Sequence, residues 1–371
     1  MATQANEYAV EYAKRELARR YYREYLPYVY PGYWKRTRMA NFLADEVQKF
    51  LETDTGHAYD ILCISTPPQH GKSMVLTETL PSWVLGHRPD SNIILAAYDA
   101  ELSERFCRRN KEKIRRYGKA LFGMGIGSID RANEFELAGH TGRVICRGIM
   151  SGITGNAAGL IIIDDPIKNQ READSPTYRA RLWNEWQSSL KSRLAAGAKV
   201  IIIMTRWSPD DLIARVAQTE TSVKILRLPV EAEEGDLLGR KVGEPLCPEL
   251  GKGEQWLKDF KSSYINDPLG GQRAWTALYQ CSPRIEDGNL VNRKWWRSYD
   301  TDEVLKFGTE LISVDAAFKD TGDYVSIQVW GKRGQDYYLR YCLNQRLNFP
   351  GTLAAIRATA KLYPEARMIL I

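Results

Sequence analysis

The chain has 371 residues, of which 44% are hydrophobic and 26% are charged, a composition typical of a globular protein with room for two domains. The net charge of +6 permits a polyanionic partner but does not require one. The six cysteines and four histidines form no C-x-x-C pair and no ligand cluster, so a zinc site is excluded and free thiols in a reducing compartment are expected. No signal-peptide pattern and no apolar run close to the roughly 18 residues of a membrane span is found, so we expect neither secretion nor a membrane.

Residues 1–58 have a helical pattern and many aromatic residues, and we expect them to form a helical segment of the first domain. Their basic side chains gather on one expected polar face, namely Lys14, Arg15, Arg19, Arg20 and Arg23. That face could be a solvated surface or a contact with another subunit. Tyr33 and Trp34 could stack on a nucleotide base, or they could belong to the core.

A phosphate-binding loop is predicted directly after the apolar run at 61–65. Its residues are Thr66, Pro67, Pro68, Gln69, His70, Gly71, Lys72 and Ser73, and a helical segment is expected at 74–85. In such a loop the backbone N–H groups and the helix start hold an anion, the lysine reaches the outer phosphates of ATP, and the serine hydroxyl binds Mg²⁺. Thr66 stands where the usual G-x-x-x-x-G-K-[ST] pattern has its first glycine, and a bare Gly-Lys-Ser also occurs by chance.

A buried strand is expected at 91–98, followed by a helix at 101–119 that is dense in positive charge. The basic residues of this helix are Arg105, Arg108, Arg109, Lys111, Lys113, Arg115, Arg116 and Lys119. Residues three or four apart share a helix face, so Arg105, Arg108 and Arg109 could line a channel for DNA or reach the nucleotide of a neighbouring subunit. A solvated helix face is the alternative.

Arg147 precedes a stretch with glycines at 148, 152, 155 and 159, which predicts a loop with unusual backbone angles and a candidate moving element. In a ring of subunits, an arginine that one subunit supplies to the ATP of the next would stabilise the charge of the transition state. Arg147 is the first candidate for this arginine finger and Arg105 is the second.

The apolar run at 159–163 ends in Asp164 and Asp165, which is typical of a strand buried on both faces of a parallel sheet. Carboxylates at the C-terminal end of such a strand lie in the ligand crevice of an open α/β sheet. We expect Asp164 to hold Mg²⁺ through water and Asp165 to polarise the attacking water. An acidic turn without catalytic function is the alternative.

The next strand, expected at 199–204, ends in Thr205 and Arg206, which could sense the γ-phosphate and pass its loss to neighbouring elements. Ser208 also fits the N-cap of a helix that has Pro209 in its first turn. Apolar runs and helical segments alternate across residues 60–230, and this alternation predicts an α/β fold with a parallel core sheet.

Three more strands are predicted at 311–315, 324–330 and 336–341. Asp315 stands on the first of them, and Asp323 is close to it in sequence. Two-metal sites use several carboxylates to hold two cations, so these residues could begin such a site, although a lone strand acid is usually a turn or edge residue. The final residues, 366–371, lie inside what looks like a further buried strand.

The motifs taken together resemble the large terminase subunit of tailed bacteriophages. The matching segments, in chain order, read TPPQHGKS (66–73), RGIMSGITGNAAGLIIIDDPIKN (147–169), IIIMTRWSPDDLIARV (201–216), GEPLCPE (243–249), ALYQ (277–280) and SVDAAF (313–318). The resemblance implies an additional-strand, RecA-like P-loop ATPase core at 59–229 with the helical segment 1–58, a lid subdomain and linker at 230–300, and an incomplete RNase H-like nuclease domain at 301–371.

The same resemblance implies ATP-driven translocation of double-stranded DNA into a viral procapsid. It implies ATP and Mg²⁺ as cofactors, with Mg²⁺ or Mn²⁺ on Asp315 and Asp323 in a complete nuclease site. The expected partners are double-stranded DNA, the capsid portal protein and the small terminase subunit, with a homo-pentamer at the portal vertex in the host cytoplasm. Thr205 and Arg206 would couple product formation to the lid.

Because the sequence ends within a predicted strand, before the further nuclease acids of the family, we expect inefficient DNA cleavage. A helicase or other P-loop motor unrelated to packaging is one alternative, but it needs a second RecA-like domain that the region around Asp315 does not resemble. A nucleotide-gated assembly scaffold is the other, and Asp165 argues against it because a scaffold needs no hydrolytic carboxylate.

Overall fold

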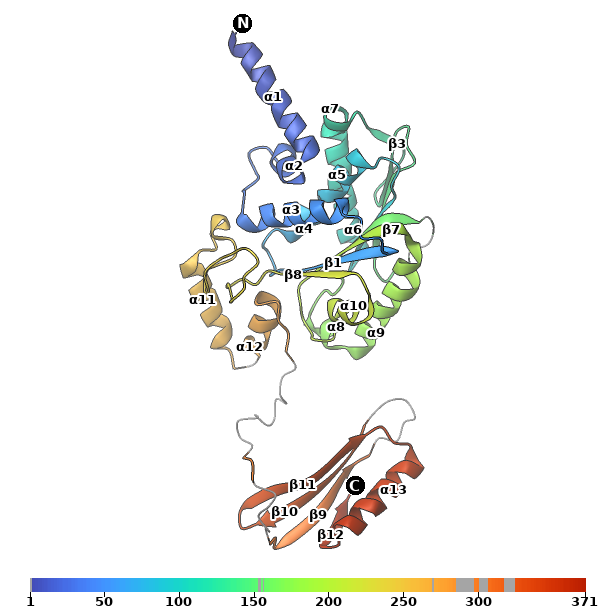
Figure 1. The fold of residues 1–371 in the computed structure, drawn as a ribbon, viewed down its shortest axis with the longest axis vertical. Coiled ribbons are helices and arrows are strands. Elements are labelled where there is room, and N and C mark those ends of the chain that lie inside the picture. The colour runs from blue at the N-terminus through green and yellow to red at the C-terminus, as the bar shows by residue number, and fades with distance from the viewer. Residues whose placement is uncertain are drawn as a thin grey trace. The chain divides into compact units, whose positions relative to one another are not determined.

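The computed structural model describes residues 2–152, 155, 157–268, 270–284, 297–299, 306–316 and 324–371. The chain divides into two compact units, Met1–Asp287 and Gly288–Ile371 (Figure 1). Each unit has a sheet and a hydrophobic core of its own. Among the described residues, no helix is both long enough and apolar enough to cross a lipid bilayer.

The first unit begins with three helices, α1 (Ala2–Arg20), α2 (Tyr22–Val29) and α3 (Arg38–Glu52). Helix α3 starts at a defined cap, because the Thr37 hydroxyl accepts a hydrogen bond from the backbone N–H of Ala40 at 3.0 Å. Helices α2 and α3 bury apolar faces in the core beside the sheet, whereas α1 projects from the unit (Figure 1). The predicted helical segment at the N-terminus is therefore present.

The described strands of the first unit form one eight-stranded sheet in the order β3-β4-β5-β2-β6-β7-β1-β8. Strands β5, β2, β6, β7, β1 and β8 run parallel, and β3 and β4 are antiparallel at one edge. The bounds are β1 (Tyr59–Ser65), β2 (Ile93–Ala97), β3 (Ile126–Arg131), β4 (Glu134–Leu137), β5 (Arg143–Gly148), β6 (Ala158–Asp164), β7 (Leu194–Met204) and β8 (Val223–Arg227). Strand β7 lies between β1 and β6, so one additional strand separates the phosphate-binding strand from the strand that ends in the two aspartates.

Helices cover both faces of this sheet, which explains why its central strands are continuous apolar runs. Leu62 and Ile64 of β1 face one core, and Ile61 and Cys63 face the other. On the first face lie α4 (Lys72–Leu76), α5 (Leu80–His87), α6 (Ala100–Lys113), a π-helical turn (Ile114–Gly118) and α7 (Lys119–Phe122). On the second lie α8 (Gln170–Asp174), α9 (Pro176–Asn184), a π-helical turn (Glu185–Leu190) and α10 (Leu212–Thr219). The predicted α/β fold with a parallel core sheet is confirmed.

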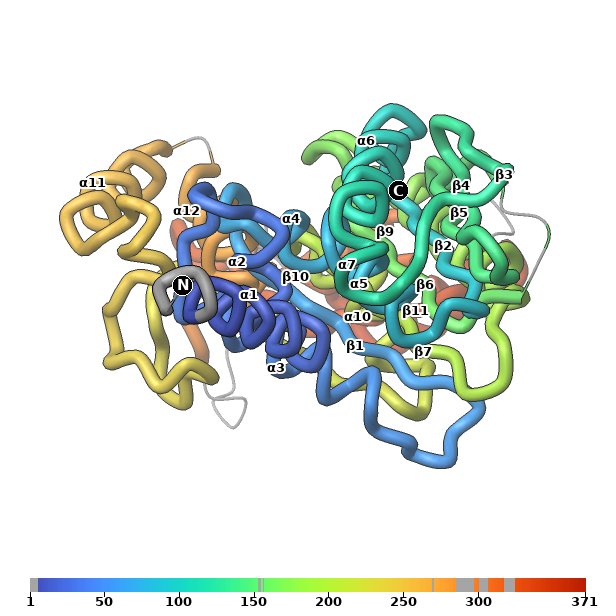
Figure 2. Tube along the Cα trace, turned by 90° about the horizontal axis from the view of Figure 1, so that it is seen from above, coloured from blue at the N-terminus to red at the C-terminus, as the bar shows by residue number. Residues whose placement is uncertain are grey.

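After β8 the chain forms α11 (Glu254–Ile265), α12 (Gly271–Ala274) and a π-helical turn (Trp275–Tyr279). A small core of its own holds this segment together, with buried Val230, Leu257 and Trp275. Figures 1 and 2 show α11 and α12 at the end of the unit opposite β3 and β4. The segment thus lies at the sheet edge that carries β1 and β8, beside the phosphate-binding loop.

The second unit is a four-stranded sheet in the order β11-β10-β9-β12 with one helix. Its elements are β9 (Thr309–Asp315), β10 (Val325–Arg333), β11 (Asp336–Gln345), α13 (Phe349–Leu362) and β12 (Ala366–Leu370). Strands β9, β10 and β11 form an antiparallel meander, and β12 returns after α13 to pair parallel with β9. The three predicted strands are confirmed.

Three local predictions were wrong. The final strand is present as β12, but only Ala366 of it is buried, because β12 lies at the edge of its sheet. The helix expected at 74–85 is broken between α4 and α5, because Pro81 in the first turn of α5 cannot donate a backbone hydrogen bond to a preceding turn. The helix expected to start at Ser208 starts instead at Leu212, where the Asp211 carboxylate accepts from the N–H of Ala214 at 3.0 Å. Serine and aspartate are comparable N-caps, so the sequence alone does not decide between these two starting points.

Candidate nucleotide site

The phosphate-binding loop joins the end of β1 to the start of α4. Ser65 of β1 pairs with Met204 of β7, and Asp164 of β6 pairs with Ile203 of β7. The C-terminal ends of these three parallel strands therefore lie side by side, and this C-terminal edge of the sheet carries the site. Gly71, which precedes α4, has a φ of +87°. No atom would obstruct a Cβ at this position, so the glycine is needed for its left-handed backbone rather than for space.

Three of the predicted residues come together at this edge. The buried ammonium of Lys72 lies 2.7 Å from Oδ2 of Asp165 and donates to Oγ1 of Thr205 at 2.5 Å. The other carboxylate oxygen of Asp165, Oδ1, accepts from the backbone N–H of Thr205 at 2.7 Å. Asp165 adopts a φ of +41°, a left-handed conformation that Asp tolerates better than most residues. The turn after β6 thus points this carboxylate at the phosphate-binding lysine.

Asp164 is fully buried, and its two oxygens differ. Oδ2 accepts a hydrogen bond from the Thr77 hydroxyl at 2.6 Å, whereas Oδ1 has no hydrogen-bond partner among the described residues. Burial, reinforced by the nearby charge of Asp165, raises the pKa of Asp164 to about 7. The nearby Ser73 hydroxyl acts in the opposite direction and lowers the pKa of this carboxyl group. A buried carboxylate oxygen without a partner beside a hydroxyl is an oxygen donor set that suits Mg²⁺.

The remaining loop residues surround these groups. The Thr66 hydroxyl is buried without a hydrogen-bond partner in the described part of the chain. His70 is 1% exposed, and its Nδ1 lies 2.7 Å from the carbonyl oxygen of Pro68, while Nε2 has no partner there. Burial, and then the charge of Lys252, lower the pKa of His70 to about 4. His70 is therefore a neutral ring in the wall of the loop.

The segment after β8 touches the tip of this loop, which sequence reasoning missed. Lys252 Nζ donates to the backbone carbonyl of Gln69 at 2.5 Å, and Gln69 has a left-handed φ of +58°. The same ammonium lies 5.3 Å from the ring centre of Trp256. The rings of Trp256 and His70 pack edge to face, with their centres 6.1 Å apart. The only sequence signal for this contact is the pair of glycines that flank Lys252, which marks a turn but no partner.

A cavity of about 300 Å³ adjoins the loop. Its wall includes Tyr33 and Trp34 from the segment before α3, Gly71 and Met74 at the start of α4, and Leu250. Trp34 stacks on Tyr30 at 6.0 Å with an interplanar angle of 13°, and its Nε1 has no hydrogen-bond partner in the described chain. The two aromatic residues singled out in the sequence therefore lie beside the phosphate-binding loop.

The predicted arginines lie outside the cluster of Lys72, Asp165 and Thr205. Arg206 donates from Nε to the buried carboxylate of Asp211 at 2.5 Å, which ties the end of β7 to the start of α10. Arg147 lies on β5, which β2 separates from β6, and its Nη1 donates to the carbonyl oxygens of Asn133 and Cys146.

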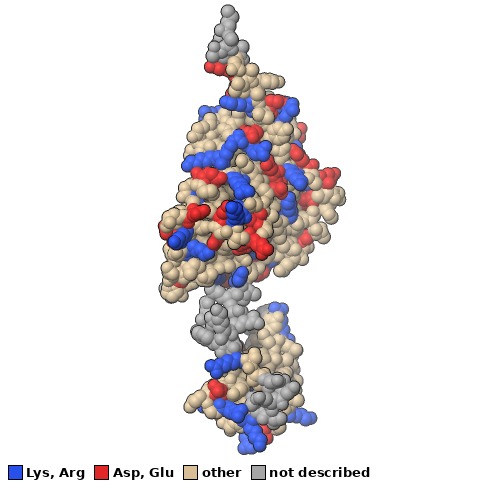
Figure 3. Space-filling model, turned by 60° about the vertical axis from the view of Figure 1, so that its left-hand side comes forward, with Lys and Arg blue, Asp and Glu red and all other residues tan. Residues whose placement is uncertain are grey.

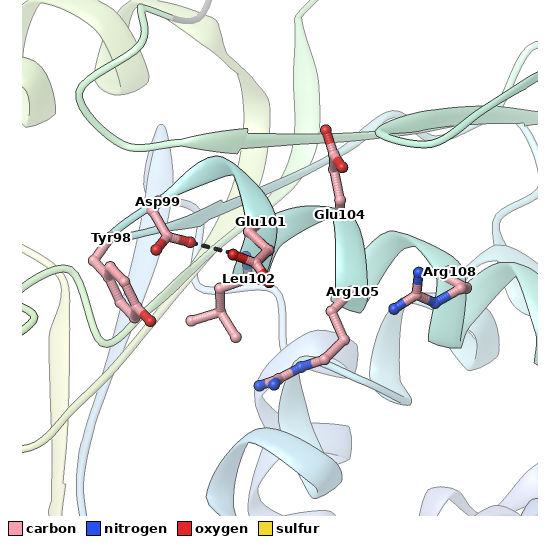
Figure 4. Close-up of a pocket in the computed structure, with 7 residues that line it drawn as sticks. All are labelled: Tyr98, Asp99, Glu101, Leu102, Glu104, Arg105 and Arg108. Atoms are coloured by element: carbon pink, nitrogen blue, oxygen red, sulfur yellow. Dashed lines mark hydrogen bonds between the residues drawn. The ribbon is translucent and has the colours of Figure 1, made fainter.

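Arg105 lines a second cavity, of about 290 Å³, at the start of α6. Tyr98 and Asp99, just beyond β2, and several residues of α6 complete its wall (Figure 4). The close-up shows Arg105 and Glu104 pointing to opposite sides of the helix. Within the described chain, neither Arg105 nor Arg108 takes part in an ion pair.

The predicted nuclease residues are only partly described. Asp315 is the exposed last residue of β9, and Asp323 lies outside the described residues. No group of three or more His, Cys, Asp or Glu side chains arranged to hold a metal occurs in the part of the chain that the structure describes.

Comparison with known proteins assigns the family. A sequence model described as terminase large subunit, T4likevirus-type, N-terminal, matches residues 63–297. No curated protein matches the chain.

Several solved structures are similar at low identity. The HK97 bacteriophage large terminase has 10% identity and a TM-score of 0.45, with 89% of this chain and 66% of that chain covered. A large terminase from a thermophilic bacteriophage, in complex with ADP, has 11% identity and a TM-score of 0.39, with 86% and 73% covered. The ATPase domain of the large terminase of Thermus phage P74-26 has 13% identity and a TM-score of 0.38, with 65% and 98% covered. These likenesses are weak, so the assignment depends on the family model, which spans well over half of the chain. The chain belongs to the terminase large-subunit family, the ATP-driven motors of viral DNA packaging.

Proposed function

We propose that this chain hydrolyses Mg²⁺-ATP at the edge formed by β1, β7 and β6 and uses the energy to drive double-stranded DNA into a procapsid. The observation that carries the proposal is the contact of Lys72 with both Asp165 and Thr205. One hydrogen-bonded group thus contains a phosphate-binding lysine, a carboxylate able to orient water and a hydroxyl at the end of the intervening strand β7.

Lys72 and Asp165 have to separate for hydrolysis. Phosphate oxygens carry more negative charge than one carboxylate, so bound ATP would take over the ammonium of Lys72. Oδ2 of Asp165 would then be free to accept a proton from water, while the Thr205 N–H keeps Oδ1 in place. Asp165 is therefore our candidate for the residue that activates water.

Ser73 and the unpaired oxygen of Asp164 would hold the Mg²⁺. A Mg²⁺ ion held there would neutralise the negative charge that develops on the phosphate groups. A cation there would also offset the cost of keeping the Asp164 carboxylate buried in its charged form.

The cavity beside Tyr33 and Trp34 is our candidate for the base-binding site. It adjoins Gly71 at the phosphate-binding loop, and an aromatic face can stack on a purine.

We propose that residues 230–300 act as the lid and that they follow the nucleotide through the hydrogen bond from Lys252 to Gln69, at the tip of the phosphate-binding loop. Thr205 and Arg206 are our candidates for coupling product formation to the lid. Arg206 is tied to Asp211 at the start of α10, within the ATPase core. Loss of the γ-phosphate would release Lys72 to return to Asp165 and to its hydrogen bond with the Thr205 hydroxyl.

The complete motor is proposed to be a ring, a homo-pentamer on the portal at the procapsid vertex in the host cytoplasm, working with the small terminase subunit. Arg147 is our first candidate and Arg105 our second for an arginine that acts on the ATP of a neighbouring subunit. Arg105 has no ion-pair partner within the described chain, which leaves its guanidinium available. An isolated subunit is then expected to hydrolyse ATP slowly.

DNA contacts are proposed on the exposed side of α6, at Arg105 and Arg108. Figure 3 shows positive and negative side chains interleaved over one face of the first unit rather than one uniform basic surface. A local pair of unpaired arginines is therefore a better candidate for a phosphate contact than the net charge of the chain.

The second unit is proposed to belong to an RNase H-like nuclease domain, with Asp315 and Asp323 as ligands of Mg²⁺ or Mn²⁺. The meander followed by a helix and a parallel fourth strand supports this proposal.

Displacement of a triplex-forming strand from double-stranded DNA tests the motor function. The chain, with portal protein present, should displace the third strand only when ATP is hydrolysed, and ATP-γ-S should not support displacement. Hydrolysis of ATP without displacement of the third strand would contradict a translocase, and binding of ATP without hydrolysis would favour the nucleotide-gated scaffold.

A further inference from the structure

Thr77, at the C-terminal end of α4, directs its hydroxyl away from its own helix. Threonines at helix ends in this chain usually donate to the carbonyl four residues back, as Thr53 does to Lys49 and Thr219 does to Arg215. Thr77 instead donates to Oδ2 of Asp164 at 2.6 Å, and both side chains are buried. A hydroxyl has one hydrogen to donate, so this bond commits it to the carboxylate.

Asn110, in the middle of α6, holds Thr77 from the other side. Its Nδ2 donates to the backbone carbonyl of Thr77 at 2.8 Å and to that of Phe106 at 2.9 Å, and its Oδ1 accepts from the N–H of Ser82 at 3.1 Å. The side chain is 0% exposed and uses both its donor and its acceptor groups. Since N–H groups must face carbonyls and the oxygen must face an N–H, the orientation of the amide is determined.

A continuous series of buried hydrogen bonds therefore connects Asn110 of α6 to Thr77, and Thr77 to Asp164. At its far end, the two oxygens of the Asp164 carboxylate are used differently. Thr77 occupies Oδ2, and Oδ1 remains without a partner in the described chain. Rotation of the carboxylate plane would break the bond to Thr77, so the hydroxyl fixes the orientation in which one oxygen of Asp164 stays without a partner in the described chain.

We propose that Thr77 is the positioning residue for the Mg²⁺ carboxylate of this motor, and that Asn110 anchors it to α6. The inference depends on the proposed function, because it takes the ion to bind at Asp164 and Ser73. Groups that orient a metal-binding carboxylate typically change metal affinity about 10–100-fold when they are removed. A role in packing alone would change stability and leave the effect of Mg²⁺ on nucleotide binding intact.

The test compares the affinity for a fluorescent ATP analogue in Mg²⁺ with the affinity in EDTA, as a ratio for each variant. Thr77→Val keeps the shape of the side chain and removes the donor, and it should lower the ratio about tenfold with the affinity in EDTA nearly unchanged. Thr77→Ser retains the hydroxyl and should restore the ratio. Asn110→Asp removes the donor to Thr77 and should lower the ratio by a smaller factor than Thr77→Val does.

The matched control is Ser103→Ala, because Ser103 is also a fully buried hydroxyl of α6, but its Oγ lies 2.8 Å from the carbonyl oxygens of Asp99 and Arg147 and has no carboxylate partner in the described chain. It should lower the melting temperature without a change in the ratio. If Thr77→Val does not fold, two other variants replace it: Asp164→Asn, and the double variant Asp164→Asn/Thr77→Val. In both of them residue 164 is uncharged, so no buried charge loses its hydrogen-bond donor. The inference predicts the same ratio for the double variant as for Asp164→Asn alone.

An unchanged ratio in Thr77→Val, or a further loss in the double variant, would overturn the inference while Mg²⁺-dependent binding by the unsubstituted chain remained. A ratio of one in the unsubstituted chain would contradict the proposed function as well.

Discussion

The ammonium of Lys72 and the carboxylate Oδ2 of Asp165 lie 2.7 Å apart, so the phosphate-binding residue and the candidate water-activating residue form an ion pair. Lys72 is nearly inaccessible to solvent, whereas the Asp165 side chain is 30% exposed. The ion pair keeps the buried cation compensated when no phosphate is near it. When ATP binds, its phosphate groups must replace the Asp165 carboxylate as the partner of Lys72. When phosphate leaves, the carboxylate must return to Lys72.

Lys72→Ala should lower the affinity for Mg²⁺-ATP by at least about tenfold, because the loop then has no cation for the outer phosphates. Equilibrium binding of a fluorescent ATP analogue measures this. Lys49→Ala, which removes an exposed lysine of α3, is the control and should bind as the unsubstituted chain does. Equal affinities for all three proteins would refute the assignment of the loop.

The buried His70 makes stability depend on pH. It stays neutral in the folded chain down to its lowered pKa of about 4, but it binds a proton near the ordinary pKa of 6.5 when the chain unfolds. Between these values the unfolded state binds more protons, so the free energy of unfolding falls as the pH falls from 6.5 to 4, by at most about 3 kcal/mol.

Urea unfolding of His70→Gln across this range should give a flatter profile than the unsubstituted chain gives. His57→Gln, at an exposed position, should leave the slope as it is. Parallel profiles for all three proteins would show that His70 is accessible to protons in the folded chain.

Lys252→Met should weaken the link between the proposed lid and the phosphate-binding loop. The hydrogen bond to Gln69 and the contact with Trp256 are both lost, and the left-handed turn at Gln69 loses the cation that holds its carbonyl. A bond from a charged donor is worth about 1.5–3 kcal/mol, so nucleotide affinity should fall about tenfold or more.

Lys252→Arg keeps a donor and should recover most of that affinity, and Lys258→Met, at an exposed position of α11, should have no effect. Calorimetric titration with ATP distinguishes the three. Unaltered binding by Lys252→Met would mean that the contact does not influence the loop.

Arg105→Gln and Arg108→Gln should weaken DNA binding uniformly across sequences. Each phosphate contact that is lost should reduce the slope of log affinity against log salt by about 1. Fluorescence anisotropy with a labelled duplex at several salt concentrations measures the slope, with Lys258→Gln as the control of equal charge change. Slopes that match the control would place the DNA contacts away from α6.

The elements that carry chemistry could be predicted because their signals are local. Apolar runs that end in Ser65, Asp164 and Met204 indicate buried parallel strands, and parallel strands place their C-terminal ends at one edge. The start of α10 was misplaced because Ser208 and Asp211 both fit an N-cap, and only the fold decides between them.

Asn110, Thr77 and Lys252 could not be found in this way. Each makes its decisive contact with a residue more than thirty positions away or on another element, and none belongs to a spacing pattern. A threonine at a helix end or an asparagine within a helix is compatible with many partners. Such contacts depend on how the helices pack on the sheet, which local patterns do not determine.

Steady-state ATP hydrolysis by the purified chain at increasing protein concentration, with Asp165→Asn alongside, tests the central claim most directly. Asp165→Asn keeps the size of the side chain and an acceptor for the Thr205 N–H, but it removes the base. We predict that it still binds Mg²⁺-ATP and that its turnover falls at least about 100-fold at every concentration. Turnover equal to that of the unsubstituted chain would contradict the account, because the carboxylate bonded to Lys72 would then have no part in hydrolysis.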